Sequence, residues 1–135
     1  MRLILVLTLA GIAGALMTVA GPAEDEASTS GQKWLSLLDD QKYEESWNQA
    51  ASMFRDQVKQ EQWVVALKRS REPLGALVSR TSPRVEFTKS LRGAPDGEYA
   101  IIHFATTFKN KGDVTERLTL VKEDGRWRLA AFGIY

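Results

Sequence analysis

The sequence of 135 residues contains no cysteine and only one histidine, His103. Without cysteine, the chain can form neither a disulfide-stabilised scaffold nor the lipid linkage of an exported lipoprotein. Zinc sites need three or four converging Cys, His or carboxylate ligands, so a single histidine argues against them. The sequence also lacks calcium loops of alternating aspartates, Gly-x-Ser-x-Gly nucleophile motifs and glycine-rich phosphate loops. We therefore expect no metal, no cofactor and no catalytic residue of these types.

The sequence also has no large excess of positive or negative residues. The chain has 18 basic and 17 acidic residues, a formal net charge of +1, and removal of Arg2 with an N-terminal segment makes the mature chain neutral. Because nucleic-acid binding needs a positive surface that neutralises phosphates, we expect no nucleic-acid partner. Hydrophobic residues make up 44% of the chain and charged residues 26%, which is typical of one folded domain.

The N-terminal residues 3–19 contain no charged side chain, follow Arg2 and precede an acidic run. This layout is that of a secretory signal peptide, which we place at residues 1–23 with cleavage after Ala20 or Ala23. The alternative is an uncleaved N-terminal helix that anchors the protein, since the stretch reaches the lower end of the roughly 17–25 residues that span a bilayer. We favour cleavage because no basic residues follow the stretch. The expected product is periplasmic or secreted and has no stable membrane span.

The mature chain is predicted to divide into two parts. Residues 24–31 are small, polar and acidic, which predicts a flexible tether. Residues 32–135 form the single folded domain. A chain of this length buries enough apolar surface to be stable without disulfides.

The first half of this domain has apolar residues at helical spacing. A short stripe that begins at Trp34 is interrupted by Asp39, and residues 43–58 carry a second, clearer stripe. The apolar residues from Trp63 onward lie on the opposite side of that helical wheel. One straight helix cannot bury both stripes against the same core. We therefore expect a break near Lys59–Gln60 and three helices in all, ended by the proline and glycine of the Arg-Glu-Pro-Leu-Gly turn.

After this turn the apolar periodicity changes to two, which predicts strands. We expect a strand at 85–88, a long strand at 98–109 and two further strands at 114–122 and 127–135. Asp124–Gly125 suits a two-residue hairpin because both positions favour positive φ. The predicted fold class is therefore α+β, with N-terminal helices packed on a curved four-stranded antiparallel sheet.

The hairpin also predicts a register for the last two strands. Pairing Glu123 with Arg126 places Leu118 opposite Ala131 on an apolar face, and it leaves a mixed polar and apolar set on the other face. A mixed face is usually covered, here by a second copy of the chain in a homodimer or by the chain itself. The interface residues predicted on this face are Arg117, Arg128, Phe132 and His103.

Several motifs of the domain together resemble those of one exported bacterial family. They are the WLSLLD stretch with Tyr43 and Trp47, the turn from Arg71 to Gly75, Arg80, GAPDGEY at 93–99, FKNK at the end of the long strand, and DGRWR at 124–128. The family is known only as a domain of unknown function, family four-zero-one-nine, and the resemblance implies export and fold but no activity. The architecture is also similar to cystatin-like folds and to the cone-shaped fold of nuclear transport factor two. That fold hosts isomerases, dehydratases, binding domains and dimerisation modules.

Four residues are candidates for a ligand site between the helices and the sheet: Arg80, Tyr43, Trp47 and Glu98. Arg80 follows the turn that brings the third helix back against the sheet, so we expect it near the aromatic residues. Aromatic side chains at helical spacing are nevertheless more often core residues than ligand contacts. His103 lies on the less apolar face of its strand, which favours a structural or interface role over acid–base catalysis.

The stretch from position 68 to position 92 contains seven basic residues and only two glutamates. They predict either an anion-recognition patch, for an envelope glycan, a lipid headgroup or an acidic protein, or simply charges that suit a helix end and keep an edge strand soluble. We favour the second interpretation.

These observations favour a non-catalytic exported domain that serves binding or assembly in the cell envelope, with a small or anionic ligand. The alternative is a small cone-fold enzyme of the isomerase or dehydratase type, with Arg80 and either Glu98 or Glu116 as its polar groups. An enzyme of this type needs a water-excluding cavity with a perturbed ionisable group, whereas a binding module has a filled interior and an exposed patch.

Overall fold

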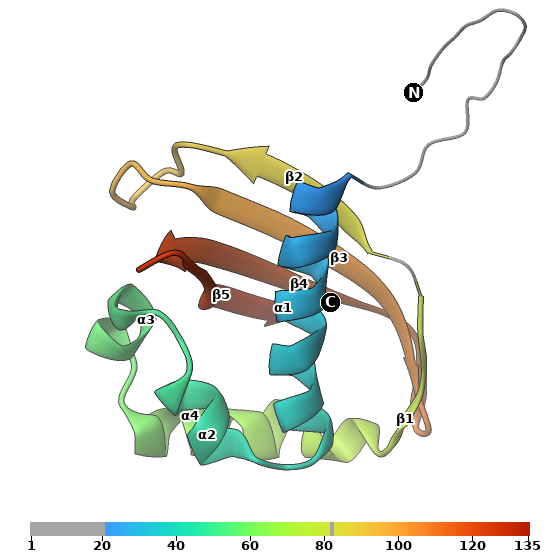
Figure 1. The fold of residues 1–135 in the computed structure, drawn as a ribbon. Helices are drawn as coiled ribbons and strands as arrows, with labels where there is room; N and C mark the ends of the chain where they lie inside the picture. The colour runs from blue at the N-terminus through green and yellow to red at the C-terminus, as the bar shows by residue number, and fades with distance from the viewer. Residues whose placement is uncertain (1–20, 82) are drawn as a thin grey trace, which may run out of the picture.

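The computed structural model describes residues 21–81 and 83–135, and within them all four α-helices pack against one antiparallel sheet (Figure 1). The elements in chain order are α1 (Pro22–Asp39), α2 (Tyr43–Asn48), α3 (Ser52–Gln57), α4 (Gln60–Ser70), the short 3-10 helix η1 (Glu72–Leu74), β1 (Leu77–Arg80), β2 (Arg84–Thr88), β3 (Tyr99–Phe108), β4 (Lys111–Glu123) and β5 (Arg126–Ile134). The predicted α+β class is confirmed. Residues 1–20 of the predicted signal peptide lie outside the described residues.

The first helix begins ten residues earlier than the sequence predicted. Residues 24–31, expected to form a tether, are the N-terminal turns of α1, and the Gly21 amide donates a hydrogen bond to Glu24 Oε1 at 3.1 Å. Ala27 and Gly31 are buried, and a Cβ added to Gly31 would lie 3.2 Å from Ile102 Cδ1. The small residues that indicated a tether instead let the helix approach the sheet closely.

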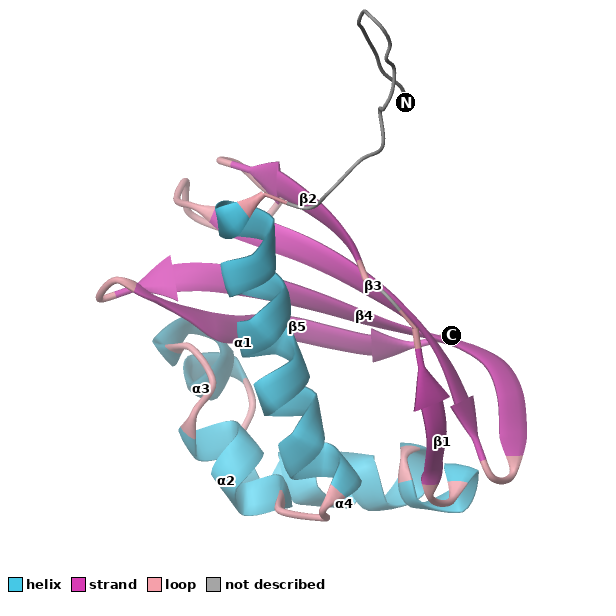
Figure 2. Ribbon diagram, turned by 45° about the vertical axis from the view of Figure 1, so that its right-hand side comes forward, coloured by secondary structure: helices cyan, strands magenta, loops and turns pink. Residues whose placement is uncertain are grey.

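The predicted break between two helices at Lys59–Gln60 is confirmed, because α3 ends at Gln57 and α4 begins at Gln60. The stretch 43–58, expected to be one helix, contains a second break between α2 and α3. There the Ala51 amide leaves the helical pattern and donates to the Leu129 carbonyl of β5 at 2.8 Å. The helical region is thereby tied to the edge of the sheet. In Figure 2, α2, α3 and α4 lie around the C-terminal end of α1.

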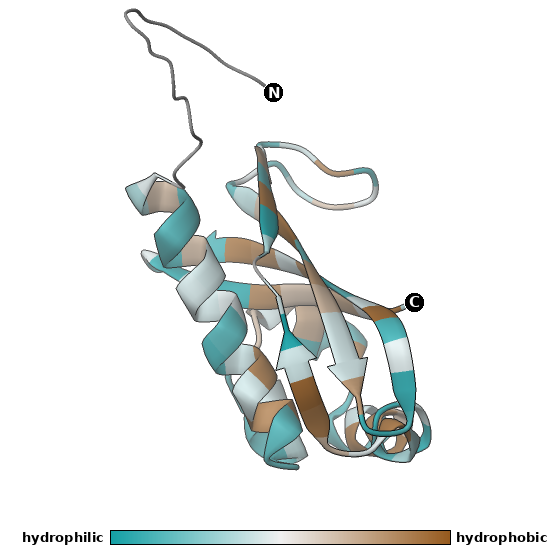
Figure 3. Cartoon of the chain, turned by 90° about the vertical axis from the view of Figure 1, so that its right-hand side faces the viewer, coloured by the Kyte–Doolittle hydropathy of each residue, from teal (hydrophilic) through white to brown (hydrophobic). Residues whose placement is uncertain are grey.

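The sheet has five strands rather than four, in the order β1-β3-β4-β5 with β2 also paired to β3. β1 and β2 follow the same edge of β3. β1 pairs with residues 106–108 and β2 with residues 99–103. The extra strand, β1, has no alternating apolar pattern, so periodicity could not reveal it. The connection from β2 to β3 turns away from α1 toward the other face of the sheet (Figure 3).

The β4–β5 hairpin follows the predicted register only near its turn. Asp124 and Gly125 have φ values of 52° and 77°, and Leu120 pairs with Leu129 as expected. Farther from the turn, the register shifts by one residue between Leu120 and Thr119. This shift places Leu118 opposite Phe132 instead of Ala131. An extra residue in one strand moves all later side chains to the opposite face. Phe132, predicted on the exposed face as an interface residue, therefore lies on the helix-covered face.

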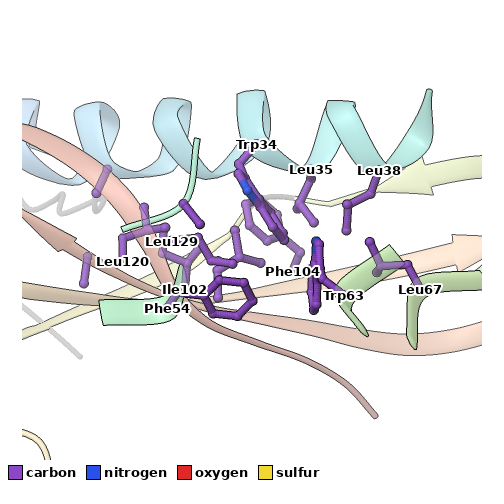
Figure 4. Close-up of a cluster of buried hydrophobic side chains, with 14 of the residues drawn as sticks. Trp34, Leu35, Leu38, Phe54, Trp63, Leu67, Ile102, Phe104, Leu120 and Leu129 are labelled. Carbon is purple, nitrogen blue, oxygen red and sulfur yellow. The ribbon is translucent and has the colours of Figure 1, made fainter. Parts of the chain in front are cut away.

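The core lies between α1, α4 and this face of the sheet. Trp34 from α1 and Trp63 from α4 project into one cluster with Ile102 and Phe104 (Figure 4). The Trp34 and Phe132 rings are 5.3 Å apart between centroids, in an edge-on arrangement that favours aromatic pairing. Among the residues described, no helix is both long and apolar enough to cross a membrane.

Candidate functional site

Two of the four predicted ligand residues are part of the helical packing. Tyr43 is only 3% exposed and belongs to the hydrophobic cluster. Trp47 is half-buried against the same cluster, and its indole Nε1 donates to the Val58 carbonyl at 2.6 Å. Because this carbonyl lies just after α3, the Trp47 hydrogen bond joins α2 to the end of α3. Both side chains therefore act in packing.

Arg80, the third predicted ligand residue, bridges two carboxylates. β1 presents its guanidinium between the end of α1 and the middle of β4. There Nη1 donates to Asp39 Oδ2 at 2.8 Å and Nε donates to Glu116 Oε1 at 2.7 Å. Glu116 is fully buried. Arg80 and Glu116, considered together in the sequence as polar groups of an enzyme, are thus in direct contact.

A second arginine and a hydroxyl complete this group, which we call the Arg80 network: Arg71, Arg80, Asp39, Glu116 and Thr106. Arg71 Nη2 donates to Asp39 Oδ1 at 2.8 Å, and its guanidinium lies over the Phe108 ring. The Thr106 hydroxyl donates to Glu116 Oε1 at 2.7 Å. All four carboxylate oxygens accept hydrogen bonds from within the network, and two positive charges balance two negative ones. Such a network holds elements together, and its carboxylates are fully occupied by the arginines and by Thr106.

The charge state of Asp39 fits this structural role. Burial alone would raise its pKa, but hydrogen bonds from Arg80 and Arg71, with their charges, outweigh burial and hold the pKa of Asp39 below its usual range. Because the folded-state pKa is below that of the unfolded chain, Asp39 stabilises the fold above about pH 4 and loses this contribution as the pH falls through its folded-state pKa. A carboxylate that stays ionised at neutral pH is unsuited to donate a proton there.

A groove of about 360 Å³ lies elsewhere, between the first turns of α1 and one end of the sheet. We call it the Phe87–Trp127 groove; it is lined by Ala23, Glu26, Phe87, Thr88, Lys89, Glu98, Tyr99, Lys122 and Trp127. The Phe87 and Trp127 rings lie 6.0 Å apart between centroids with 33° between their planes. Phe87 is 46% exposed, so part of its ring is accessible from the groove.

Charged side chains of both signs frame the aromatic pair. Lys122 Nζ lies 4.9 Å from the centroid of the Trp127 ring and 3.5 Å from Glu26 Oε1. Glu98, the fourth predicted ligand residue, lines this groove and does not contact Arg80. Within the described residues, no group of three or more His, Asp or Glu side chains is arranged to hold a metal ion. The groove can therefore bind by apolar contact and by stacking.

Local sequence patterns do not single out the two aromatic residues of this groove. Alternation predicts Phe87 in one strand and Trp127 in the strand after the hairpin, but it cannot distinguish a covered part of a sheet face from an uncovered part. Both side chains face the helix side of the sheet, at the end that lies beside the first turns of α1. The alternation in each strand is the sequence pattern that could have indicated this shared face. The proximity of Phe87 and Trp127 depends on how β2 and β5 are positioned relative to each other through β3 and β4.

The predicted interface residues do not lie together. His103 and Arg117 pair across β3 and β4 on the face away from the helices. Arg128 instead turns to the helical layer, where Nη1 donates to the Gln49 carbonyl at 3.2 Å and Nε lies 3.8 Å from Glu123 Oε1. Phe132 packs against the core, as described above. The four residues therefore do not share one face of the sheet, and a homodimer interface through them stays a prediction.

A family model described as "Protein of unknown function (DUF4019)" matches residues 30–132, which include most of α1, α2–α4 and nearly the whole sheet. A search of curated proteins finds no match.

Proposed function

The chain belongs to the family of proteins of unknown function DUF4019, and from this premise we propose that it is a non-catalytic binding domain. Its ligand is a small molecule with a flat apolar or aromatic part, and the Phe87–Trp127 groove is its site. The observation that carries the proposal is the half-exposed Phe87 ring beside Trp127 in a groove of about 360 Å³. Ligand sites are concave, mostly apolar and edged by a few polar groups.

Two features of the groove support a ligand of this kind. A second ring can lie against the Phe87 and Trp127 rings in the offset or edge-on geometry that aromatic groups prefer. Lys89 and Glu98 at the rim are exposed and make no ion pair with any residue in the described ranges, so they are available to polar substituents of the ligand.

The filled interior supports binding over catalysis. A cone-fold isomerase or dehydratase would use Arg80 and Glu116 in a cavity between helices and sheet, but these two side chains are occupied by each other. Trp34, Trp63 and Phe104 belong to the buried cluster between the helices and the sheet. Arg80 also lines a hollow of about 400 Å³ together with Phe104, but its guanidinium is held there by Asp39 and Glu116.

Substitution of Phe87 with serine tests the proposal, with the aromatic dye anilinonaphthalene sulfonate as the probe ligand. We expect the dye to bind the wild-type protein and to bind F87S about tenfold more weakly, because one of the two stacking rings is lost. Dye fluorescence titration measures the affinity, and an unchanged melting temperature of F87S would show that the fold is intact.

The matched control is Val65→Ser, which removes an exposed apolar side chain from α4, outside the groove. V65S is expected to bind the dye as wild type does. Equal dye affinity in F87S and wild type, or equal losses in F87S and V65S, would contradict the groove as the site.

We also propose that the protein is exported and cleaved after Ala20 rather than Ala23. Cleavage after Ala20 leaves α1 complete, including the hydrogen bond from Gly21 to Glu24, whereas cleavage after Ala23 removes its first turn and one wall of the groove. Intact-mass analysis of protein recovered from its native envelope is expected to give a chain that begins at Gly21. A membrane-bound species that begins at Met1 would instead support the uncleaved anchor.

A further inference from the structure

The face of the sheet away from the helices carries a row of three basic side chains. Arg84 of β2 pairs with His103 of β3, and His103 pairs with Arg117 of β4, so the three occupy directly opposite positions on neighbouring strands. Side chains in such positions have Cβ atoms about 4.5–5.5 Å apart. A second arginine of the basic stretch, Arg92, lies in the β2–β3 connection, and it lines a hollow together with Arg117.

The charges of this row are not compensated by the protein. Among residues 21–81 and 83–135, Arg84, Arg92 and Arg117 form no ion pair, and Glu86 on the same face of β2 lies beyond ion-pair distance of them. His103 separates the two arginines of the row, and no carboxylate of the described residues lies close enough to neutralise either of them.

Two buried polar atoms in the row also lack partners. His103 Nδ1 and Arg117 Nε are inaccessible to solvent and form no hydrogen bond with any described residue. The Arg80 network on the opposite face is a direct contrast, since its carboxylate oxygens all accept hydrogen bonds from within the network. The same chain thus pairs Arg71 and Arg80 with carboxylates, although Arg71 Nε also has no hydrogen-bond partner, and it leaves Arg84 and Arg117 without an anion.

The surface on both sides of the row is hollowed and offers hydroxyl groups. A hollow of about 310 Å³ is lined by Arg84, His103 and Thr115, and another of about 370 Å³ by Arg92, Arg117 and Thr119. An anion placed on the row would therefore meet hydroxyl groups from β4 as well as the basic side chains.

We propose that this row binds the phosphate group of a phosphorylated ligand. Arginine presents a rigid fork of donors that matches phosphate oxygens, and a tetrahedral anion can accept from neighbouring strands at once. The site uses Arg84 and Arg117 as its principal donors, with His103 between them. It lies on the face of the sheet opposite the core and shares no residue with the Phe87–Trp127 groove, so it is independent of the function proposed above.

Titration with inorganic phosphate tests the site, with isothermal calorimetry to measure affinity and NMR to follow the His103 ring signals. The expected result is saturable binding that shifts these signals, and affinities about tenfold lower in Arg84→Gln and Arg117→Gln, because each variant removes a charge-assisted hydrogen bond. The matched control is Arg69→Gln, which removes the same charge from an exposed position on α4 and is expected to bind as wild type.

Vesicles distinguish the source of the phosphate group. Binding to phosphatidylglycerol vesicles that is competed by inorganic phosphate and lost in R117Q would identify a lipid headgroup, and binding of free phosphate without vesicle binding would identify a soluble phosphorylated molecule. Absence of phosphate binding by wild type, or equal losses in R69Q and R117Q, would overturn the proposal. The F87S variant is expected to bind phosphate normally, so the two sites fail or succeed separately.

Discussion

Replacing Arg80 with alanine is expected to lower the free energy of unfolding by about 3–5 kcal/mol, because it leaves two carboxylates, Asp39 and the fully buried Glu116, without their shared cation. A typical domain of this size is stable by only about 5–15 kcal/mol in total. Urea unfolding followed by tryptophan fluorescence measures the change. The R80A protein is expected to be marginally folded.

The matched control is Arg84→Ala, which removes an exposed arginine without an ion pair from the next strand along the same sheet edge. Its stability is expected to change by no more than about 0.5 kcal/mol. If R80A unfolds at the same urea concentration as R84A, the Arg80 network does not hold α1 to the sheet, and its residues would be available for another role.

Replacing Trp63 with alanine is expected to cost a further large share of stability, about 3–5 kcal/mol, through the lost contacts and the cavity left behind. The Trp63 ring lies 5.0 Å from the Phe54 ring and 6.1 Å from the Trp34 ring between centroids. Its Nε1 also donates to the hydroxyl of Ser46 at 2.9 Å, and the Ser46 carbonyl accepts from Trp34 Nε1 at 2.9 Å. Loss of Trp63 therefore disturbs the packing of α1, α2 and α4 together.

The matched control is Val65→Ala, and the melting temperatures of both variants are compared with that of the wild type. Val65 is two residues away on α4 and 49% exposed, so its truncation is expected to shift stability by about 0.5 kcal/mol or less. Similar melting temperatures for W63A and wild type would mean that Trp63 lies in an open site, and would revive the cavity required for the alternative enzyme.

The candidate sites were only partly foreseeable. The sequence predicts Arg80 near the helix–sheet junction and offers either Glu98 or Glu116 as its polar companion, without deciding between them. Asp39, 41 residues before Arg80, is recognisable in the sequence only as an interruption of a helical stripe. Its role depends on where α1 stops relative to β1, and no local pattern encodes that position.

Local patterns by themselves determined the order of helices followed by strands, the helix break near Lys59, the Asp124–Gly125 hairpin and the α+β class. These follow from periodicity and turn chemistry, which act over a few residues. Tertiary structure alone decided the helical state of residues 24–31, because the burial of Ala27 and Gly31 against the sheet outweighs the weak helix propensity of residues 28–31. It also decided the face of Phe132, because one extra residue in β5 reverses every side chain beyond it. The Phe87–Trp127 groove and the row from Arg84 to Arg117 arise in the same way, since strands far apart in sequence meet only when the sheet has formed.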